Sequence, residues 1–183
     1  MTSINQYLYV AARAPMEGLF LDVGCGTGTI GFILKAWGRK GDIVGIDLYE
    51  ESLKKAKQIY DHVVLCDGRF LPFRNKVFSF VSAVEVLEHI SKIEGKLFLK
   101  QLESLVNGLL IITTPNGFQK HGEGSENPYQ KHLSGWKGRE LKNLGFKVRG
   151  LLVRSKLALL IPPFITWYFL LFADDLLGIK KVN

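Results

Sequence analysis

Short runs of apolar, β-prone residues alternate along the chain with longer segments in which apolar residues recur every three or four positions. The first pattern predicts buried β-strands, and the second predicts amphipathic helices. Strands are expected at residues 19–23, 42–47, 63–66, 77–84, 109–113 and 146–153, and helices at residues 30–37, 50–60, 91–107 and 136–144. This alternation predicts an α/β three-layer sandwich, in which helices cover both faces of a mostly parallel, twisted sheet.

One helix start carries a specific local signal. Ser91 is followed three residues later by Glu94, which is the spacing of a capping box. We expect the helix that follows to bury one apolar face, formed by Ile93, Leu97, Leu102, Leu105 and Val106. The segment from 115 to 135 is rich in Gly, Asn, Pro, Ser and His, and it is expected to form a long loop of functional importance.

The last part of the chain is unusually apolar. Residues 157–173 contain no charged residue, and Pro163 is well placed to begin a helix, so an apolar C-terminal helix is expected over residues 157–177. A helix that is apolar on every face is normally buried. Burial in the core or across a homodimer is therefore expected, with peripheral membrane contact as the alternative. The segment is short for a membrane span and is interrupted by prolines.

Length and composition limit the class of protein. The 183 residues allow one domain, residues 1–183, and a hydrophobic fraction of 47% excludes disorder as the main state. Only two cysteines occur, Cys25 and Cys66, which excludes a disulfide scaffold and fits a reducing compartment. The N-terminus does not resemble a secretory signal, so a cytoplasmic location is expected. Because Cys and His nowhere cluster at ligand spacing along the sequence, no metal is expected.

The charge balance is basic, with 24 Lys and Arg against 17 Asp and Glu. An excess of positive charge is typical of proteins with anionic partners, including nucleic acid. Here the basic residues are scattered, and the densest group, at Lys54, Lys55 and Lys57, has the spacing of one solvated helix face. The excess therefore favours solubility over nucleic-acid binding.

A glycine-rich turn follows the first predicted strand. The segment GCGTGTIG at 24–31 contains Gly26-x-Gly28-x-x-Gly31, which fits the fingerprint of dinucleotide-binding proteins. Glycines allow the backbone to approach a ligand closely, and the following helix offers unpaired N–H groups at its N-terminus. Several classes of cofactor use this arrangement, so the glycines do not identify the ligand.

Three aspartates near the ends of predicted strands narrow the choice of cofactor. Asp22 lies two residues before the turn, and a carboxylate there would repel a diphosphate. Asp47 ends the second strand, where a carboxylate can accept hydrogen bonds from both ribose hydroxyls. Asp67 ends the third strand, where it can accept from an adenine amino group. The set suits a nucleoside with a cationic tail better than a pyrophosphate cofactor.

At this point the sequence resembles the class I, Rossmann-like S-adenosylmethionine-dependent methyltransferases, in particular the branch that includes quinone-biosynthesis and other small-molecule enzymes. The resemblance rests on LDVGCGTG at 21–28, GIDLYEESLKKAK at 45–57, CDGRFLPF at 66–73 and FSFVSAVEVLEHI at 78–90. It covers residues 19–153, which are expected to form the core of the domain. It implies a methyltransferase that uses S-adenosylmethionine and releases S-adenosylhomocysteine.

The resemblance also implies which residues bind the cofactor. Asp47 should bind the ribose hydroxyls, Asp67 should take the adenine amino group, and Glu85 should lie beside the methionine and the reacting methyl. The full implied set is Asp22, Gly24, Cys25, Gly26 and Gly28 in and before the turn, Asp47 and Leu48 after the second strand, Asp67, Gly68 and Arg69 after the third, and Glu85 after the fourth. The family's sheet ends in an antiparallel strand, but Pro162 and Pro163 argue against that closing hairpin here.

Methyl transfer from a sulfonium is an in-line displacement that depends mainly on positioning. A base is needed only when the acceptor must lose a proton. His89 and His132 are the catalytic candidates, and His121 also lies near the predicted mouth. His89 could equally brace the loop in which it lies, and His132 could have a structural role in the loop at 115–135.

The acceptor is expected to be a small-molecule or apolar, lipid-like compound. Base-amino methyltransferases of the family carry an Asn or Asp, two prolines and an aromatic after the fourth strand, whereas this chain has AVEVLEHI at 83–90. Nucleic acid is therefore a less favoured acceptor. Three alternatives stay open: an RNA methyltransferase, suggested by the basic charge; a non-catalytic S-adenosylmethionine-binding partner subunit; and a nicotinamide dehydrogenase, suggested by the glycine spacing.

Overall fold

The computed structural model describes residues 4–122, 124–151 and 174–182. Within these ranges there are two single-turn 3₁₀ helices, η1 (Leu87–His89) and η2 (Pro128–Gln130). The other elements are α1 (Ile4–Ala11), β1 (Phe20–Val23), α2 (Thr29–Ala36), β2 (Ile43–Asp47), α3 (Glu50–Ala56), β3 (His62–Leu65), β4 (Phe78–Val84), α4 (Lys92–Leu105), β5 (Val106–Pro115), α5 (Gly138–Asn143), β6 (Lys147–Leu151) and β7 (Asp175–Val182).

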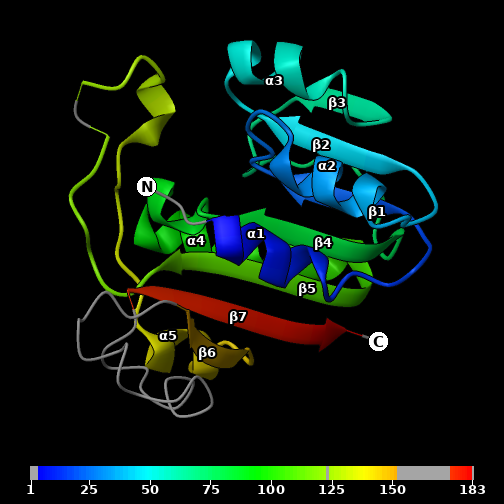
Figure 1. Ribbon diagram of the computed structural model, residues 1–183. Coiled ribbons are helices and arrows are strands. Elements are labelled where there is room, and N and C mark those ends of the chain that lie inside the picture. Colours follow the sequence, from blue (N-terminus) through cyan, green and yellow to red (C-terminus); the bar gives the residue numbers. More distant parts are fainter. Residues whose placement is uncertain (1–3, 123, 152–173, 183) are drawn as a thin grey trace, which may run out of the picture.

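The strands form one sheet of seven, in the order β3-β2-β1-β4-β5-β7-β6 (Figure 1). The neighbouring strands from β3 to β5 are parallel, whereas β7 runs antiparallel to both β5 and β6. The chain order reverses at β1, which pairs with β2 on one side and β4 on the other. In open α/β sheets, ligands bind outside the carboxyl ends of the strands at such a reversal. The topology thus locates the expected site between the ends of β1 and β4.

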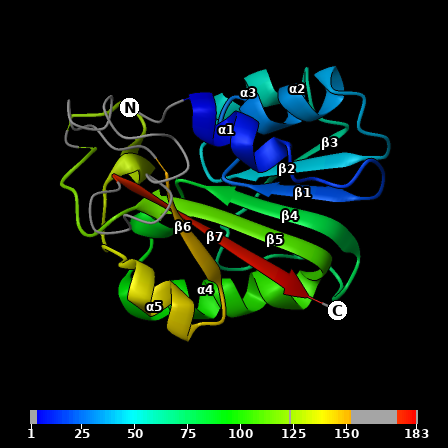
Figure 2. The same ribbon diagram turned by 60° about the horizontal axis from the view of Figure 1, so that its bottom comes forward.

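Helices cover both faces of the sheet, with α1, α2 and α3 on one side and α4 and α5 on the other (Figure 2). Each face buries its own apolar core. The first core joins Ile30, Ile33 and Leu34 of α2 to sheet residues, and the second joins Phe98 and Leu102 of α4 to the opposite face. Two buried faces explain why β4 is apolar at every position except Ser79 and Ser82. The three-layer α/β expectation is confirmed.

The capping signal at Ser91 is confirmed, because its side chain accepts a hydrogen bond from the backbone N–H of Glu94. The apolar face expected for α4 was partly wrong. Ile93 is 79% exposed and Leu97 is 62% exposed, and Val106 begins β5 instead of ending the helix. The side chains that pack on the sheet are those of Phe98, Leu99, Leu102 and Leu105. Counting back from Leu102 in helical steps reaches 98 and 99, not 97.

The end of the chain differs from expectation. The closing antiparallel strand, which the prolines argued against, is present as β7. Residues 175–177, expected as the end of an apolar helix, instead begin that strand, and the core therefore extends beyond 153. An inner strand satisfies its backbone hydrogen bonds on both edges while Leu176 and Leu177 are buried. The rest of the predicted apolar helix, with its homodimer or membrane contact, lies outside the described residues.

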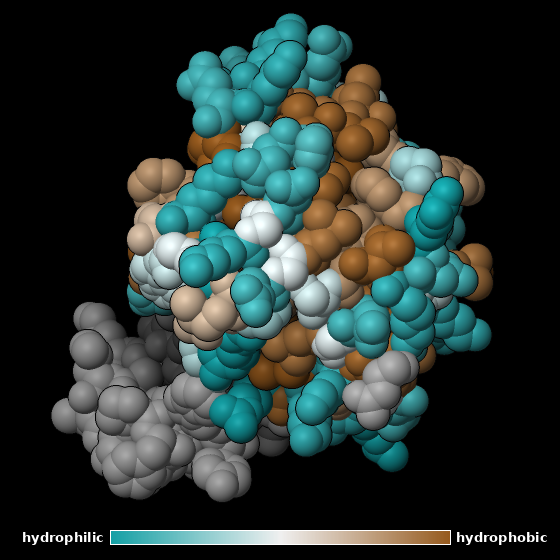
Figure 3. Space-filling view, turned by 90° about the vertical axis from the view of Figure 1, so that its right-hand side faces the viewer, coloured by the Kyte–Doolittle hydropathy of each residue, from teal (hydrophilic) through white to brown (hydrophobic). Residues whose placement is uncertain are grey.

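The surface of α3 agrees with the prediction that its lysines form one solvated helix face. Figure 3 shows a hydrophilic region at the top of the molecule, where α3 lies. Lys54, Lys55 and Lys57 are exposed there, and Lys54 pairs with Glu51 at 2.6 Å. This cluster is the solvated helix face that its spacing predicted. Within residues 4–122, 124–151 and 174–182, no helix combines the length and apolarity needed to cross a membrane.

Candidate functional site

A cleft of about 540 Å³ opens at the carboxyl ends of the parallel strands. Its walls come from the segments that follow β1, β2, β3 and β4, from the loop between β5 and α5, and from Tyr7 of α1. In Figure 1 this loop projects from the left-hand end of the sheet, in yellow-green. Of the implied cofactor residues, the cleft brings together Gly24, Gly26, Asp47, Leu48, Asp67, Gly68, Arg69 and Glu85.

The glycine turn brings backbone close to the segment after β4. Gly24 has a φ of +68°, and a Cβ placed there would lie 2.4 Å from Cγ2 of Val86. Gly26 has a φ of +53°, and a Cβ there would meet nothing within 4 Å. Only glycine adopts such angles without strain and without occupying this space. The turn therefore packs tightly against the side chain of Val86 at Gly24 and leaves open volume at Gly26.

Asp47 connects the glycine turn to the end of β2. One carboxylate oxygen, Oδ2, accepts from the backbone N–H of Gly26 at 2.8 Å, and Oδ1 accepts from that of Tyr49 at 2.8 Å. These bonds fix the orientation of a carboxylate that lines the cleft. Each carboxylate oxygen has a further lone pair with which to accept from a ligand.

Asp67 is held by its neighbour Arg69. The guanidinium forms a salt bridge to Oδ2 of Asp67 at 2.6 Å and a second one to Glu94 at 2.7 Å. Hydrogen bonding from Arg69 lowers the pKa of Asp67, which therefore stays ionised. An ionised carboxylate at the end of β3 is a hydrogen-bond acceptor only, which suits an amino-group donor.

Asp22, Cys25 and Gly28 lie outside the lining of the cleft. Asp22 is buried, with Oδ2 accepting from the hydroxyl of Tyr60 at 2.6 Å and Oδ1 accepting from that of Ser82 at 2.6 Å. The Tyr60 hydroxyl in turn accepts from the backbone N–H of Gly31 at 3.0 Å. Asp22 thus ties β1 to β4 and to the start of α2, beneath the glycine turn. Any role for it in cofactor binding stays a prediction.

Burial raises the pKa of Asp22 from 3.8 to about 6. Between pH 4 and 6 the unfolded chain ionises this group while the folded chain keeps its proton, so the free energy of unfolding falls as the pH rises through this window. The expected fall is about 3 kcal/mol, and it is complete above pH 6. Urea unfolding measured from pH 4 to 7 should show this slope, and Asp22→Asn should make it shallower by this amount, leaving the part that comes from the carboxyls of Glu85 and Glu88, whose pKa values burial also raises.

Asp42→Asn provides a matched control, because its carboxylate is exposed at the amino end of β2. This variant should keep the pH dependence of the parent chain. Equal slopes in the parent and in Asp22→Asn would show that burial of Asp22 is not coupled to stability.

Glu85 follows β4 with a φ of +57°, an unusual conformation for a residue with a side chain. Its backbone N–H donates to the carbonyl of Thr113 at 3.1 Å, and its Oε1 accepts from the Thr113 hydroxyl at 3.0 Å. Burial, and then the nearby carboxylate of Asp175, raise the pKa of Glu85 to about 7. The strained turn points an acidic side chain into the cleft, where a cation would favour its ionised form.

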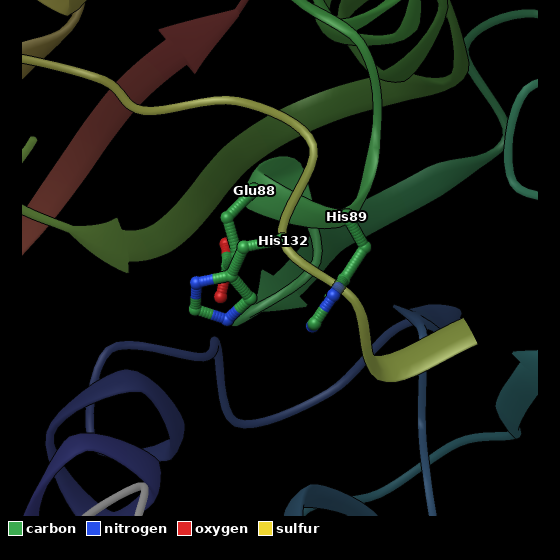
Figure 4. Close-up of side chains that lie close together, drawn as sticks. All are labelled: Glu88, His89 and His132. Atoms are coloured by element: carbon green, nitrogen blue, oxygen red, sulfur yellow. The ribbon is translucent and has the colours of Figure 1, made fainter. Parts of the chain in front are cut away.

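Histidines gather on the other side of the cleft. The rings of His89 and His132 are 4.9 Å apart between centroids, and those of His132 and His121 are 5.2 Å apart. Figure 4 shows Glu88 and His89 extending from η1 and His132 reaching toward them from the loop. The structure therefore brings the two catalytic candidates together and adds Glu88, which the sequence analysis did not single out.

Both candidate imidazoles are held through the same ring atom. The Nδ1 atom of His89 lies 3.1 Å from the carbonyl oxygen of Lys131, and that of His132 lies 2.6 Å from the carbonyl oxygen of Gln119. A carbonyl only accepts, so in each ring Nδ1 carries the proton and Nε2 has a free lone pair. Burial lowers the pKa of both histidines, which favours the neutral ring as a proton acceptor.

Comparisons with known proteins agree with this arrangement. Residues 20–107 match the family described as a methyltransferase domain. A comparison with curated protein sequences gives no match. Among solved structures, the chain is similar to a magnesium protoporphyrin IX methyltransferase from Synechocystis PCC 6803 with bound S-adenosylmethionine, at 17% identity and a TM-score of 0.65, covering 98% of this chain and 78% of that one.

Two further structures have similar folds. A S-adenosylmethionine-dependent methyltransferase from Archaeoglobus fulgidus is 18% identical, with a TM-score of 0.69 and coverage of 97% of this chain and 90% of that one. The small RNA methyltransferase HEN1 is 17% identical, with a TM-score of 0.68 and coverage of 98% of this chain and 25% of that one. The chain therefore contains a methyltransferase domain at residues 20–107, and its strand order and the cleft at the reversal of β1 are those of the class I, Rossmann-like fold of S-adenosylmethionine-dependent methyltransferases.

Proposed function

We propose that the enzyme transfers the methyl group of S-adenosylmethionine to a hydroxyl oxygen of a small, polar acceptor. The observation that carries this proposal is the pair of imidazoles on the acceptor side of the cleft, His89 and His132, each with its Nδ1 directed to a backbone carbonyl. Loss of a proton from the acceptor is what makes a hydroxyl oxygen nucleophilic enough to attack the methyl. The free Nε2 of His89 or His132 can accept that proton.

The cofactor is proposed to lie along the strand ends. Asp47 would accept from the two ribose hydroxyls, with Leu48 against the adenine, and Asp67 would accept from the adenine amino group. The methionine part would then lie over Gly24 and Gly26, with its cationic groups facing Glu85. In support, these residues line one cleft, and Asp47 is bonded directly to the glycine turn.

A polar acceptor is favoured over a lipid-like one because histidine, lysine, glutamine and carboxylate side chains line this side of the cleft. They include His121, Gln119, Lys120 and Asp175. This lining can hold hydroxyl and carboxyl groups in a defined orientation. The fold likeness to HEN1 and the net charge of +7 are the observations that support RNA as a second acceptor.

The test uses the full chain with S-adenosylmethionine labelled in the methyl group. A panel of phenols and hydroxy acids would be offered in parallel with short single-stranded and duplex RNA, and the products would be identified by mass spectrometry. Methyl ethers of small acceptors are expected, with no transfer to RNA at low salt. Label found only in RNA would reject the small acceptor, and transfer to an amine only would reject the hydroxyl.

A further inference from the structure

We propose that Glu88, His89 and His132 form a binding site for one divalent transition-metal cation. One ligand atom from each residue lies within 4.8 Å of the other two. The residues come from two segments of the chain, because η1 supplies Glu88 and His89 and the loop supplies His132. All three line the cleft on its acceptor side.

The histidines are oriented as metal-ligating histidines usually are. Such residues donate their second ring N–H to a carbonyl or carboxylate, which fixes the ring and leaves the other nitrogen free to bind. His89 and His132 both show this arrangement, with Nδ1 directed to the carbonyls of Lys131 and Gln119. One histidine held in this way would be enough to fix the loop in place. Here two such rings lie near one carboxylate, that of Glu88.

Glu88 provides the second, independent observation. Its side chain is buried, with a residue exposure of 2%. Oε2 accepts from the Thr114 hydroxyl at 3.0 Å, but Oε1 has no hydrogen-bond partner among the described residues. A buried carboxylate oxygen without a partner is costly unless a donor or a cation meets it.

The two segments that supply the ligands are already fixed to each other. The backbone N–H groups of Leu133 and Ser134 donate to the carbonyl of Glu88 at 2.8 and 3.0 Å. Ser134 also accepts from the indole N–H of buried Trp136 at 3.0 Å. These bonds hold His132 close to η1, so the three ligand residues are already near one another before an ion binds. Metal–ligand bonds of about 2.0–2.2 Å hold the ligand atoms of a tetrahedral site about 3.4 Å apart, so atoms that lie up to 4.8 Å apart would close by about 1 Å when an ion binds.

The ligand set indicates the class of ion. Two imidazole nitrogens and one carboxylate oxygen suit Zn²⁺, Co²⁺, Mn²⁺ or Fe²⁺, whereas Ca²⁺ and Mg²⁺ prefer oxygen ligands alone. Three protein ligands leave coordination positions open, as in catalytic sites. These positions would face the acceptor, and a hydroxyl bound there would lose its proton more readily. That catalytic role rests on the proposed function, whereas ion binding does not. With the ion bound, the ligating Nε2 atoms of His89 and His132 could no longer accept the proton, which would instead pass to solvent.

The sequence analysis expected no metal, because it considered only residues close together along the chain. His132 is 43 residues from His89, and the fold alone brings them together. Spacing along the sequence therefore could not predict the complete site. Only the adjacent pair Glu88-His89 was visible in the sequence as two potential ligands.

The test is a titration of the untagged full chain, freed of metal with EDTA and dialysed, with Co²⁺ followed by visible absorption. One Co²⁺ per chain is expected to bind and to be displaced by Zn²⁺. Glu88→Gln and His132→Gln should each weaken binding at least about tenfold. His62→Gln is the matched control, since His62 is an exposed histidine on β3, outside the cleft lining. Saturable binding that survives His132→Gln would overturn the proposal.

A second measurement does not depend on the folding of any variant. The chain has four histidines, so its imidazole resonances can be assigned and followed by NMR. Substoichiometric Mn²⁺ should broaden the resonances of His89 and His132 and leave those of His62 sharp. Equal broadening of all four, or of none, would reject the site. Calorimetry with S-adenosylhomocysteine on the same sample keeps the two proposals separate, because cofactor binding without metal binding would overturn only the metal site.

Discussion

Replacing Asp47 by Ala is expected to weaken the binding of S-adenosylhomocysteine at least about 100-fold. The Asp47 carboxylate faces the cleft, and it also accepts from the backbone N–H of Gly26. The variant therefore removes the acceptor proposed for the ribose hydroxyls and releases the glycine turn. Hydrogen bonds to a charged group contribute about 1.5–3 kcal/mol each, and each 1.4 kcal/mol is a factor of ten in affinity. Isothermal titration calorimetry measures the effect.

The matched control for this variant lies at the other end of the same strand. Asp42 immediately precedes β2, and its carboxylate is exposed. Asp42→Ala should bind S-adenosylhomocysteine within a factor of about two of the parent chain. A folded Asp47→Ala variant that binds as tightly as Asp42→Ala would show that the cofactor does not depend on this carboxylate.

Tyr60→Phe is expected to lower the free energy of unfolding by about 3 kcal/mol. The change removes one hydroxyl but leaves two buried polar groups unsatisfied, the backbone N–H of Gly31 and a carboxylate oxygen of Asp22. Each unsatisfied buried group costs about 1–3 kcal/mol. For a chain of 183 residues this corresponds to a fall in Tm of roughly 6–12 °C. Thermal unfolding followed by circular dichroism measures it.

Tyr129→Phe removes a hydroxyl from an exposed tyrosine in the loop, and it should change the unfolding free energy by less than about 0.5 kcal/mol. A Tyr60→Phe variant as stable as Tyr129→Phe would mean that the hydroxyl does not connect Asp22 to the start of α2. The conclusion that Asp22 holds the start of α2 against β1 through Tyr60 would then be withdrawn.

The sequence was most informative where one physical constraint determines the pattern. Strands buried on both faces must be apolar, so β4 was predicted nearly to its ends. The Ser91 cap located the start of α4, but the buried face was misplaced because Ile93 and Leu97 are as apolar as Phe98 and Leu99. The strand β7 was missed because Leu176 and Leu177 follow the apolar run at 157–173 after only two aspartates, and only pairing with β5 and β6 distinguishes strand from helix there.

The residues of the site, too, were predictable from the sequence only where a local rule places them. The strand-end rule predicted that Asp22, Asp47 and Asp67 would lie beside one crevice, and the family resemblance added Glu85. The cleft is lined by Asp47, Asp67 and Glu85 but not by Asp22. The position of Asp22 depends on Tyr60 and Ser82, 38 and 60 residues away, which no local pattern links to it. The contact of His132 with η1 is equally nonlocal, because it depends on how the loop at 115–135 folds back onto Glu88.

The most direct test is a crystal structure of the chain with S-adenosylhomocysteine. The ribose hydroxyls should lie within hydrogen-bonding distance of Asp47, the adenine amino group near Asp67, and the homocysteine part over Gly24 and Gly26 beside Glu85. A ligand bound elsewhere, or bound in this cleft with its ribose away from Asp47, would contradict the account.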